Sequence, residues 1–166
     1  KTGYAKATGH VVFIDTAEKS KLISGQVEYN ENSKFMLATQ RPKLITLADK
    51  DSTFMRADTM MSIRVKDQKA LKKIETLTSN KKIKSYTYNL LTADSSWKSE
   101  TNDEPKLIIA NRHVKIFSDS MQAVCDSLSY SQSDSTFKLY RSPVMWSKSQ
   151  QSSGDTIFIH TIQNKL

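Results

Sequence analysis

Short runs of alternating apolar and polar residues, each ended by a polar turn, recur along this chain and restrict it to β-structure. Across Ile23, Gly25, Val27 and Tyr29 the period is two, which places these positions on one face of a sheet. Polar clusters such as residues 30–33 end the runs, as turns do. Before residue 61 the pattern predicts strands at His10–Ile14, Leu22–Tyr29, Phe35–Thr39, Leu44–Ala48 and Phe54–Met60.

The last third of the chain repeats this order of features. It predicts strands at Val114–Ser118, Met121–Tyr130, Thr136–Tyr140, Val144–Ser147 and Asp155–Ile162. Tyr29 precedes Pro42 by the same interval at which Tyr130 precedes Pro143. We interpret this as an internal duplication within one domain over residues 1–166, with repeat 1 at about 5–61 and repeat 2 at about 107–162.

A lysine-rich insertion, about residues 62–106, separates the two repeats. Within it, Asp67–Glu75 fits a short helix and Lys82–Leu91 fits a strand. Lysine ammonium groups are suited to phosphate, so candidate phosphate contacts are Lys72, Lys73, Lys81 and Lys82. The alternative is a solvated loop.

Composition narrows the possible functions. Four glycines leave almost no material for glycine-rich phosphate loops, which argues against a nucleotide-binding enzyme. A single cysteine, Cys125, excludes an intramolecular disulfide, and its apolar surroundings favour a buried side chain. The net charge of +8 permits anionic partners, but no nucleic-acid recognition module is found. No apolar run approaches the roughly 20 residues of a membrane-spanning helix.

No catalytic or metal-binding constellation is found either. His10, His113 and His160 are far apart in sequence, and Asp58, Asp126 and Asp155 fit backbone hydrogen bonding better than acid catalysis. We therefore expect a non-enzymatic protein without a cofactor or a metal ion.

The second repeat resembles the OstA-like family. The resemblance is carried by residues 114–118, by the strand that ends in Leu128-Ser129-Tyr130, and by Pro143-Val144-Met145-Trp146. The first repeat is similar but looser, with Gly25 where the second has Asp126. The insertion is not covered by the resemblance.

The resemblance implies a fold, a compartment and a function. The fold would be an open β-jellyroll, in which two antiparallel sheets form a slot. The protein would be periplasmic, bind lipopolysaccharide through its lipid A acyl chains, and join related transport proteins or further copies by strand-edge addition, without spanning the membrane. The start at Lys1, without an apolar leader, fits an exported mature chain or a trimmed fragment.

Inward-facing apolar side chains would line such a slot. The slot candidates are Ile14, Ile23, Val27, Leu37, Leu44, Phe54, Ile116, Val124, Leu128, Phe137, Leu139, Trp146, Ile157 and Ile159. The same positions would form the core of a closed sandwich, because alternation is identical in both. The alternative function is therefore a structural β-repeat scaffold of the cell envelope that binds no lipid.

Overall fold

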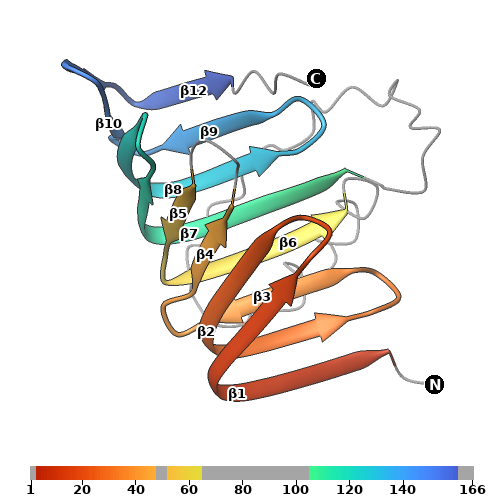
Figure 1. Ribbon diagram of the computed structural model, residues 1–166. Helices are drawn as coiled ribbons and strands as arrows, with labels where there is room; N and C mark the ends of the chain where they lie inside the picture. Colours follow the sequence, from red (N-terminus) through yellow and green to blue (C-terminus); the bar gives the residue numbers. More distant parts are fainter. Residues whose placement is uncertain (1–2, 48–51, 65–104, 161–166) are drawn as a thin grey trace, which may run out of the picture.

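The computed structural model describes residues 3–47, 52–64 and 105–160, and this part of the chain is entirely β-structure (Figure 1). Every pair of neighbouring strands is antiparallel. The strands are β1 (Tyr4–Asp15), β2 (Ser20–Asn30), β3 (Phe35–Thr39), β4 (Lys43–Thr46), β5 (Thr53–Arg56), β6 (Thr59–Arg64), β7 (Lys106–Phe117), β8 (Gln122–Ser131), β9 (Thr136–Tyr140), β10 (Val144–Ser147), β11 (Gln150–Ser153) and β12 (Thr156–His160).

Six strands close into a barrel-like ring. The hydrogen-bonded path β7–β5–β4–β2–β3–β6 returns to β7, because β6 pairs with β7 as well as with β3. β1 is added to the ring on β2, and β8 to β12 are added beyond β7. The two ends of the described chain therefore lie at opposite ends of the stack, β1 at one and β12 at the other (Figure 1).

The long strands β1, β2, β7 and β8 each take part in two ladders of hydrogen bonds. Ladder I consists of residues 4–8 of β1, 26–30 of β2, β3, β6, 106–111 of β7, 127–131 of β8, β9 and β12. Ladder II consists of residues 11–15 of β1, 20–24 of β2, β4, β5, 114–117 of β7, 122–125 of β8, β10 and β11. The long strands thus connect the ladders, and the short strands belong to one ladder each.

β-bulges bend the long strands where they pass between ladders. In β1 the register with β2 shifts between Thr8 and Val11, where Gly9 has a φ of 77°. In β7 the register with β8 shifts between Asn111 and Val114, and Arg112 and His113 have φ values of 62° and 51°. An extra residue on one strand bends it and lets it leave one sheet for another.

Asp58 fixes the bulge of β7 from the neighbouring strands. It lies in the break between β5 and β6, and its backbone N–H faces the carbonyl oxygens of Asn111, at 3.2 Å, and Arg112, at 3.0 Å. Its carboxylate Oδ2 lies 2.9 Å from Nδ1 of His113. The bend is therefore held by backbone and side-chain contacts together.

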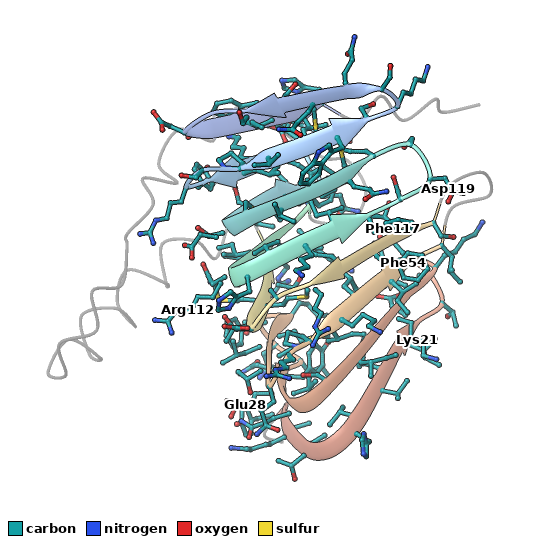
Figure 2. The ribbon with its side chains drawn as sticks, turned by 90° about the vertical axis from the view of Figure 1, so that its left-hand side faces the viewer. Lys21, Glu28, Phe54, Arg112, Phe117 and Asp119 are labelled. Atoms are coloured by element: carbon teal, nitrogen blue, oxygen red, sulfur yellow. The ribbon has the colours of Figure 1, made fainter. Side chains whose placement is uncertain are left out.

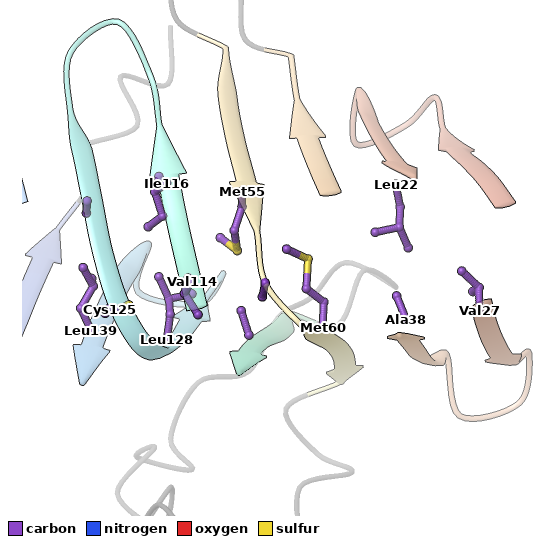
Figure 3. Packing of buried hydrophobic residues seen from close by; sticks show 13 residues of the cluster. Leu22, Val27, Ala38, Met55, Met60, Val114, Ile116, Cys125, Leu128 and Leu139 are labelled. Atoms are coloured by element: carbon purple, nitrogen blue, oxygen red, sulfur yellow. The ribbon is translucent and has the colours of Figure 1, made fainter. Parts of the chain in front are cut away.

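The main hydrophobic core lies between the two ladders (Figure 3). Val27, Leu128 and Leu139 enter it from ladder I, and Leu22 and Ile116 enter it from ladder II. Burying each such side chain contributes about 1.5–3 kcal/mol relative to leaving it exposed. A second cluster, Ile63, Leu107 and Ile109, lies on the other face of ladder I.

The expectation of an all-β fold is confirmed, and the bounds predicted for β3, β9 and β10 coincide with those observed. The single strand predicted at Phe54–Met60 is wrong: it is two strands, β5 and β6, because the chain crosses from ladder II to ladder I at Ala57 and Asp58. β11 was not predicted, because its sequence is wholly polar. The helix and strand expected within the insertion lie outside the described residues.

The two halves of the chain share one backbone pattern. β1 and β2 pair across a bulge as β7 and β8 do. Positive φ values recur at Lys34 and Ser135, and again in the pairs before Pro42 and Pro143, both of which are buried. The turns and bulges of the first half therefore recur at equivalent positions in the second half.

The two halves differ where Gly25 stands in place of Asp126. In the second half, Arg141 forms an ion pair with Asp126, with Nη1 3.1 Å from Oδ2. In the first half, Gln40 occupies the position of Arg141, and a Cβ added to Gly25 would lie 2.7 Å from the Cβ of Gln40. The backbone at residue 25 lies so close to the Gln40 side chain that only glycine, which has no Cβ, fits without a shift.

We predict that Gly25→Ala destabilises the protein by about 1–3 kcal/mol, because the added methyl overlaps Gln40. The cost should fall when Gln40→Gly is added, since glycine removes the overlapping Cβ and suits the φ of 64° at this position. Urea unfolding of both single variants and the double variant measures this. Additive effects would contradict the predicted contact.

Candidate ligand-binding site between the ladders

A cavity of about 330 Å³ opens between the ladders in the second half of the chain. Met145 contributes to its wall from ladder II, Met121 from the residue just before β8, and Phe137 and Ile159 from ladder I. All four pack against the main core while remaining partly exposed. The cavity is thus an extension of the core that is lined by apolar side chains and open to solvent.

Hydroxyl groups form the rest of the cavity lining. Thr53, Ser118, Ser120 and Ser147 lie near the ends of ladder II strands. The hydroxyl of Ser118 lies 3.2 Å from the backbone nitrogen of Met121, which donates to it, and the hydroxyl of Ser147 donates to the carbonyl oxygen of Ser120 at 3.4 Å. Local hydrogen bonds therefore engage part of this polar rim.

The chemistry of the cavity suits apolar groups. None of the described residues that line it carries a titratable side chain, so these residues offer no general acid or base. Methionine is unbranched and adaptable, and can pack against apolar groups of different shapes. The site fits a flexible hydrocarbon better than a polar substrate.

Only some of the predicted slot residues lie at the cavity or in the space between the ladders. Phe137 and Ile159 line it directly. Val27, Ile116, Leu128 and Leu139 are buried in the main core, and Leu44 and Ile157 pack against that core. These eight residues face the space between the ladders.

The other six slot candidates lie on the outer faces of the ladders. In each case the residues before and after the candidate face the core or its edge. Successive side chains of a strand point to opposite faces, so the candidate itself points away from the core. These residues are Ile14, Ile23, Leu37, Phe54, Val124 and Trp146. Ile14, Phe54 and Trp146 are exposed.

The bends in the long strands explain why some predicted slot residues lie on the outer faces. Leu22, Ser24 and Val27 are all buried, so the inward positions of β2 change parity where the strand crosses to ladder I. The single face expected for Ile23, Gly25, Val27 and Tyr29 is therefore wrong for Ile23. Trp146, predicted to face inward, lies on the outer face of β10, and its neighbour Met145 faces the cavity instead. Met121 precedes β8, so alternation within a strand does not predict it.

A second, smaller hollow of about 250 Å³ lies on the outer face of ladder II. Phe54 and Phe117 lie beside it with ring centroids 6.4 Å apart, and Lys43, Arg56 and Lys115 surround them. Figure 2 shows the two phenylalanines on the same side as Lys21, with Arg112 on the opposite side. This hollow is separate from the space between the ladders.

The histidines do not come together. His113 contacts Asp58, and Nδ1 of His160 lies 2.8 Å from the hydroxyl of Thr136, whereas His10 is exposed on β1. Among the described residues, no group of three or more His, Cys, Asp or Glu side chains is placed to hold a metal ion. Within the same residues, no helix is long and apolar enough to cross a membrane. The candidate phosphate contacts Lys72, Lys73, Lys81 and Lys82 lie outside them.

No protein-family model matches the chain, and no curated protein matches it.

Cys125 should be chemically inert in the folded protein. Burial raises the pKa of its thiol to about 12, which leaves almost no thiolate at neutral pH. We predict that the native chain resists alkylation by iodoacetamide at pH 8 and reacts after unfolding in urea, as followed by intact mass. Rapid labelling of the native chain would contradict the buried placement.

Proposed function

We propose that the protein is a periplasmic carrier module that shields the acyl chains of lipopolysaccharide, or of a similar glycolipid, between its two ladders. The observation that supports this most is the cavity lined by Met121, Phe137, Met145 and Ile159. Under this proposal the ladders act as the walls of a jellyroll slot, and the cavity is the described part of that slot.

The energetics favour a hydrocarbon ligand. Each methylene group removed from water contributes roughly 0.8 kcal/mol, so an acyl chain gains affinity along its length without specific polar contacts. The hydroxyl groups of Thr53, Ser118, Ser120 and Ser147 would supply polar contacts to a headgroup beside the acyl chain. Under the same proposal, the lysines of the insertion meet the phosphates of that headgroup.

The free strand edges support a carrier that works in an assembly. Among the described residues, β1 pairs only with β2, β11 only with β10, and β12 only with β9. Unpaired edges are sites for β-strand addition by another chain. A row of such modules would carry a lipid from one slot to the next.

A second candidate function, a structural scaffold without a lipid ligand, is favoured by contacts that tie the ladders together. Nζ of Lys106, on ladder I, lies 3.7 Å from Asp15 and 3.4 Å from Glu18 at the β1–β2 turn of ladder II. Gln132 donates to Glu18 from the same side, at 3.4 Å. These contacts restrict the separation of the ladders in the middle of the stack.

Two neighbouring substitutions test the carrier proposal. Ile159→Asp places a charge in the cavity wall, whereas Phe158→Asp places the same charge on the outer face of β12, where Phe158 is 59% exposed. We predict that lipid A binding, measured by native mass spectrometry during titration, falls more than tenfold in Ile159→Asp and changes less than twofold in Phe158→Asp.

The folded state of both variants is checked by circular dichroism and urea unfolding before titration. Met145→Gln, a milder change in the same wall, provides a second test if Ile159→Asp does not fold. Equal binding by the cavity and outer-face variants, or no saturable binding by the native chain, would favour the scaffold.

A further inference from the structure

The outer face of ladder II carries two parallel rows of side chains. Successive residues of a strand point to opposite faces, so the neighbours of the buried Leu22, Met55 and Ile116 point outward. The cross-strand pairs order these outward residues from β1 to β8. The cation row is Val12, Ile23, Lys43, Arg56, Lys115 and Val124. The apolar row is Ile14, Lys21, Ile45, Phe54, Phe117 and Gln122.

Three positive charges lie next to one another in the cation row. Lys43 is directly opposite Arg56, and Arg56 is directly opposite Lys115. All three residues are exposed, and none of them forms an ion pair with another described residue. Neither row contains an Asp or a Glu. Because like charges directly opposite each other destabilise a sheet, an anion bound at this face would relieve a repulsion that the fold itself leaves uncompensated.

Large apolar side chains stand exposed in the row beside these charges. Ile14 is 63% exposed, Phe54 40% and Phe117 49%. Trp146, which is 38% exposed, extends the apolar row onto β10, where it pairs with Gln122. The rows are two residues apart along each strand, a spacing of about 6.6 Å. The face therefore presents a line of apolar groups and a line of cations within one side-chain length of each other.

We infer that the outer face of ladder II docks on the surface of a bilayer that contains anionic phospholipids. The apolar row enters the interfacial region, as the apolar face of an amphipathic helix does to a depth of about 5–10 Å, and the cation row contacts the lipid phosphates. Tryptophan suits this depth, and the long stem of Lys21 lets its ammonium group reach the headgroups. The inference goes beyond the proposed carrier function, because this face lies on the other side of ladder II from the cavity.

A bilayer fits the apolar row better than a single-stranded nucleic acid does. Bases bind such surfaces by stacking on the flat faces of aromatic rings. The rings of Phe54 and Phe117 are tilted by 54° to each other, so they offer no common stacking plane. Ile14 and Ile45, in the same row, have no ring at all. Hydrocarbon contact requires no ring geometry, so every apolar member of the row contributes to it.

Vesicle sedimentation tests the docking surface with the full chain. One set of vesicles contains phosphatidylcholine alone, and the other contains equal parts of phosphatidylcholine and phosphatidylglycerol. We predict that binding to the anionic vesicles is roughly tenfold or more tighter than binding to the neutral ones, and that it weakens as salt is added. Equal binding to both sets would overturn the inference.

A matched pair of substitutions locates the charge effect. Arg56→Gln removes one positive charge from the cation row, whereas Lys138→Gln removes one from the outer face of ladder I, since its neighbour Leu139 is buried in the core. Arg56→Gln should weaken binding to anionic vesicles about fivefold, and Lys138→Gln less than about twofold. Both variants have the same net charge, so an equal loss in the two would contradict docking by this face.

The fluorescence of Trp146 tests whether the apolar row enters the bilayer. The chain has two tryptophans, so Trp97→Phe leaves Trp146 as the single reporter. On anionic vesicles its emission should shift to shorter wavelength, and brominated phospholipid should quench it. Unchanged emission from protein that has sedimented with the vesicles would overturn insertion of the apolar row.

Two further measurements separate this inference from its competitors. Saturable binding of a single-stranded oligonucleotide, with no binding to anionic vesicles, would overturn the inference in favour of a nucleic-acid surface. Lipid A titration of Arg56→Gln by native mass spectrometry should match that of the native chain, because Arg56 does not line the cavity. Loss of lipid A binding in this variant would contradict the separation of the two sites, whereas failure of the vesicle tests alone would leave the carrier proposal intact.

Discussion

The bend in the long strands is the constraint on which the rest of the structure depends. β1, β2, β7 and β8 each supply hydrogen bonds to both ladders, so the bulges at Gly9–His10 and Arg112–His113 set how the ladders face each other. Straight strands would give one twisted sheet with no enclosed face. The core and the cavity both exist because the strands turn at these points.

The bend also determines what fills the space between the ladders. In the first half, Phe13 and Tyr29 meet across that space with ring centroids 6.2 Å apart. In the second half, a cavity remains beside Phe137 and Ile159. The same backbone therefore brings two aromatic rings together at one end and leaves a ligand-sized space at the other, because different side chains line it.

Sequence patterns predicted the strands well and the faces only in part. Period-two alternation located most strands, because alternation reports that a segment is half buried. It could not reveal that β2 changes its inward parity between Ser24 and Val27, because a bulge depends on pairing with a strand distant in sequence. The inward placement predicted for Ile23 is wrong for that reason. In β10, a strand of four residues, alternation alone does not distinguish the inward face, which carries Met145, from the outer face, which carries Trp146. The polar β11 carries no alternation and is held by its pairing with β10.

The cavity and the proposed assembly edge are physically connected. The cavity is lined in part by β12, so a second copy placed against β12 would adjoin it. Met121, Phe137, Met145 and Ile159, the apolar residues of its wall, all lie beyond β7 in the strand order. Among the described residues, β12 pairs only with β9, so a single ladder of hydrogen bonds holds this side of the wall. The apolar space therefore lies beyond the closed six-strand ring, beside a free edge.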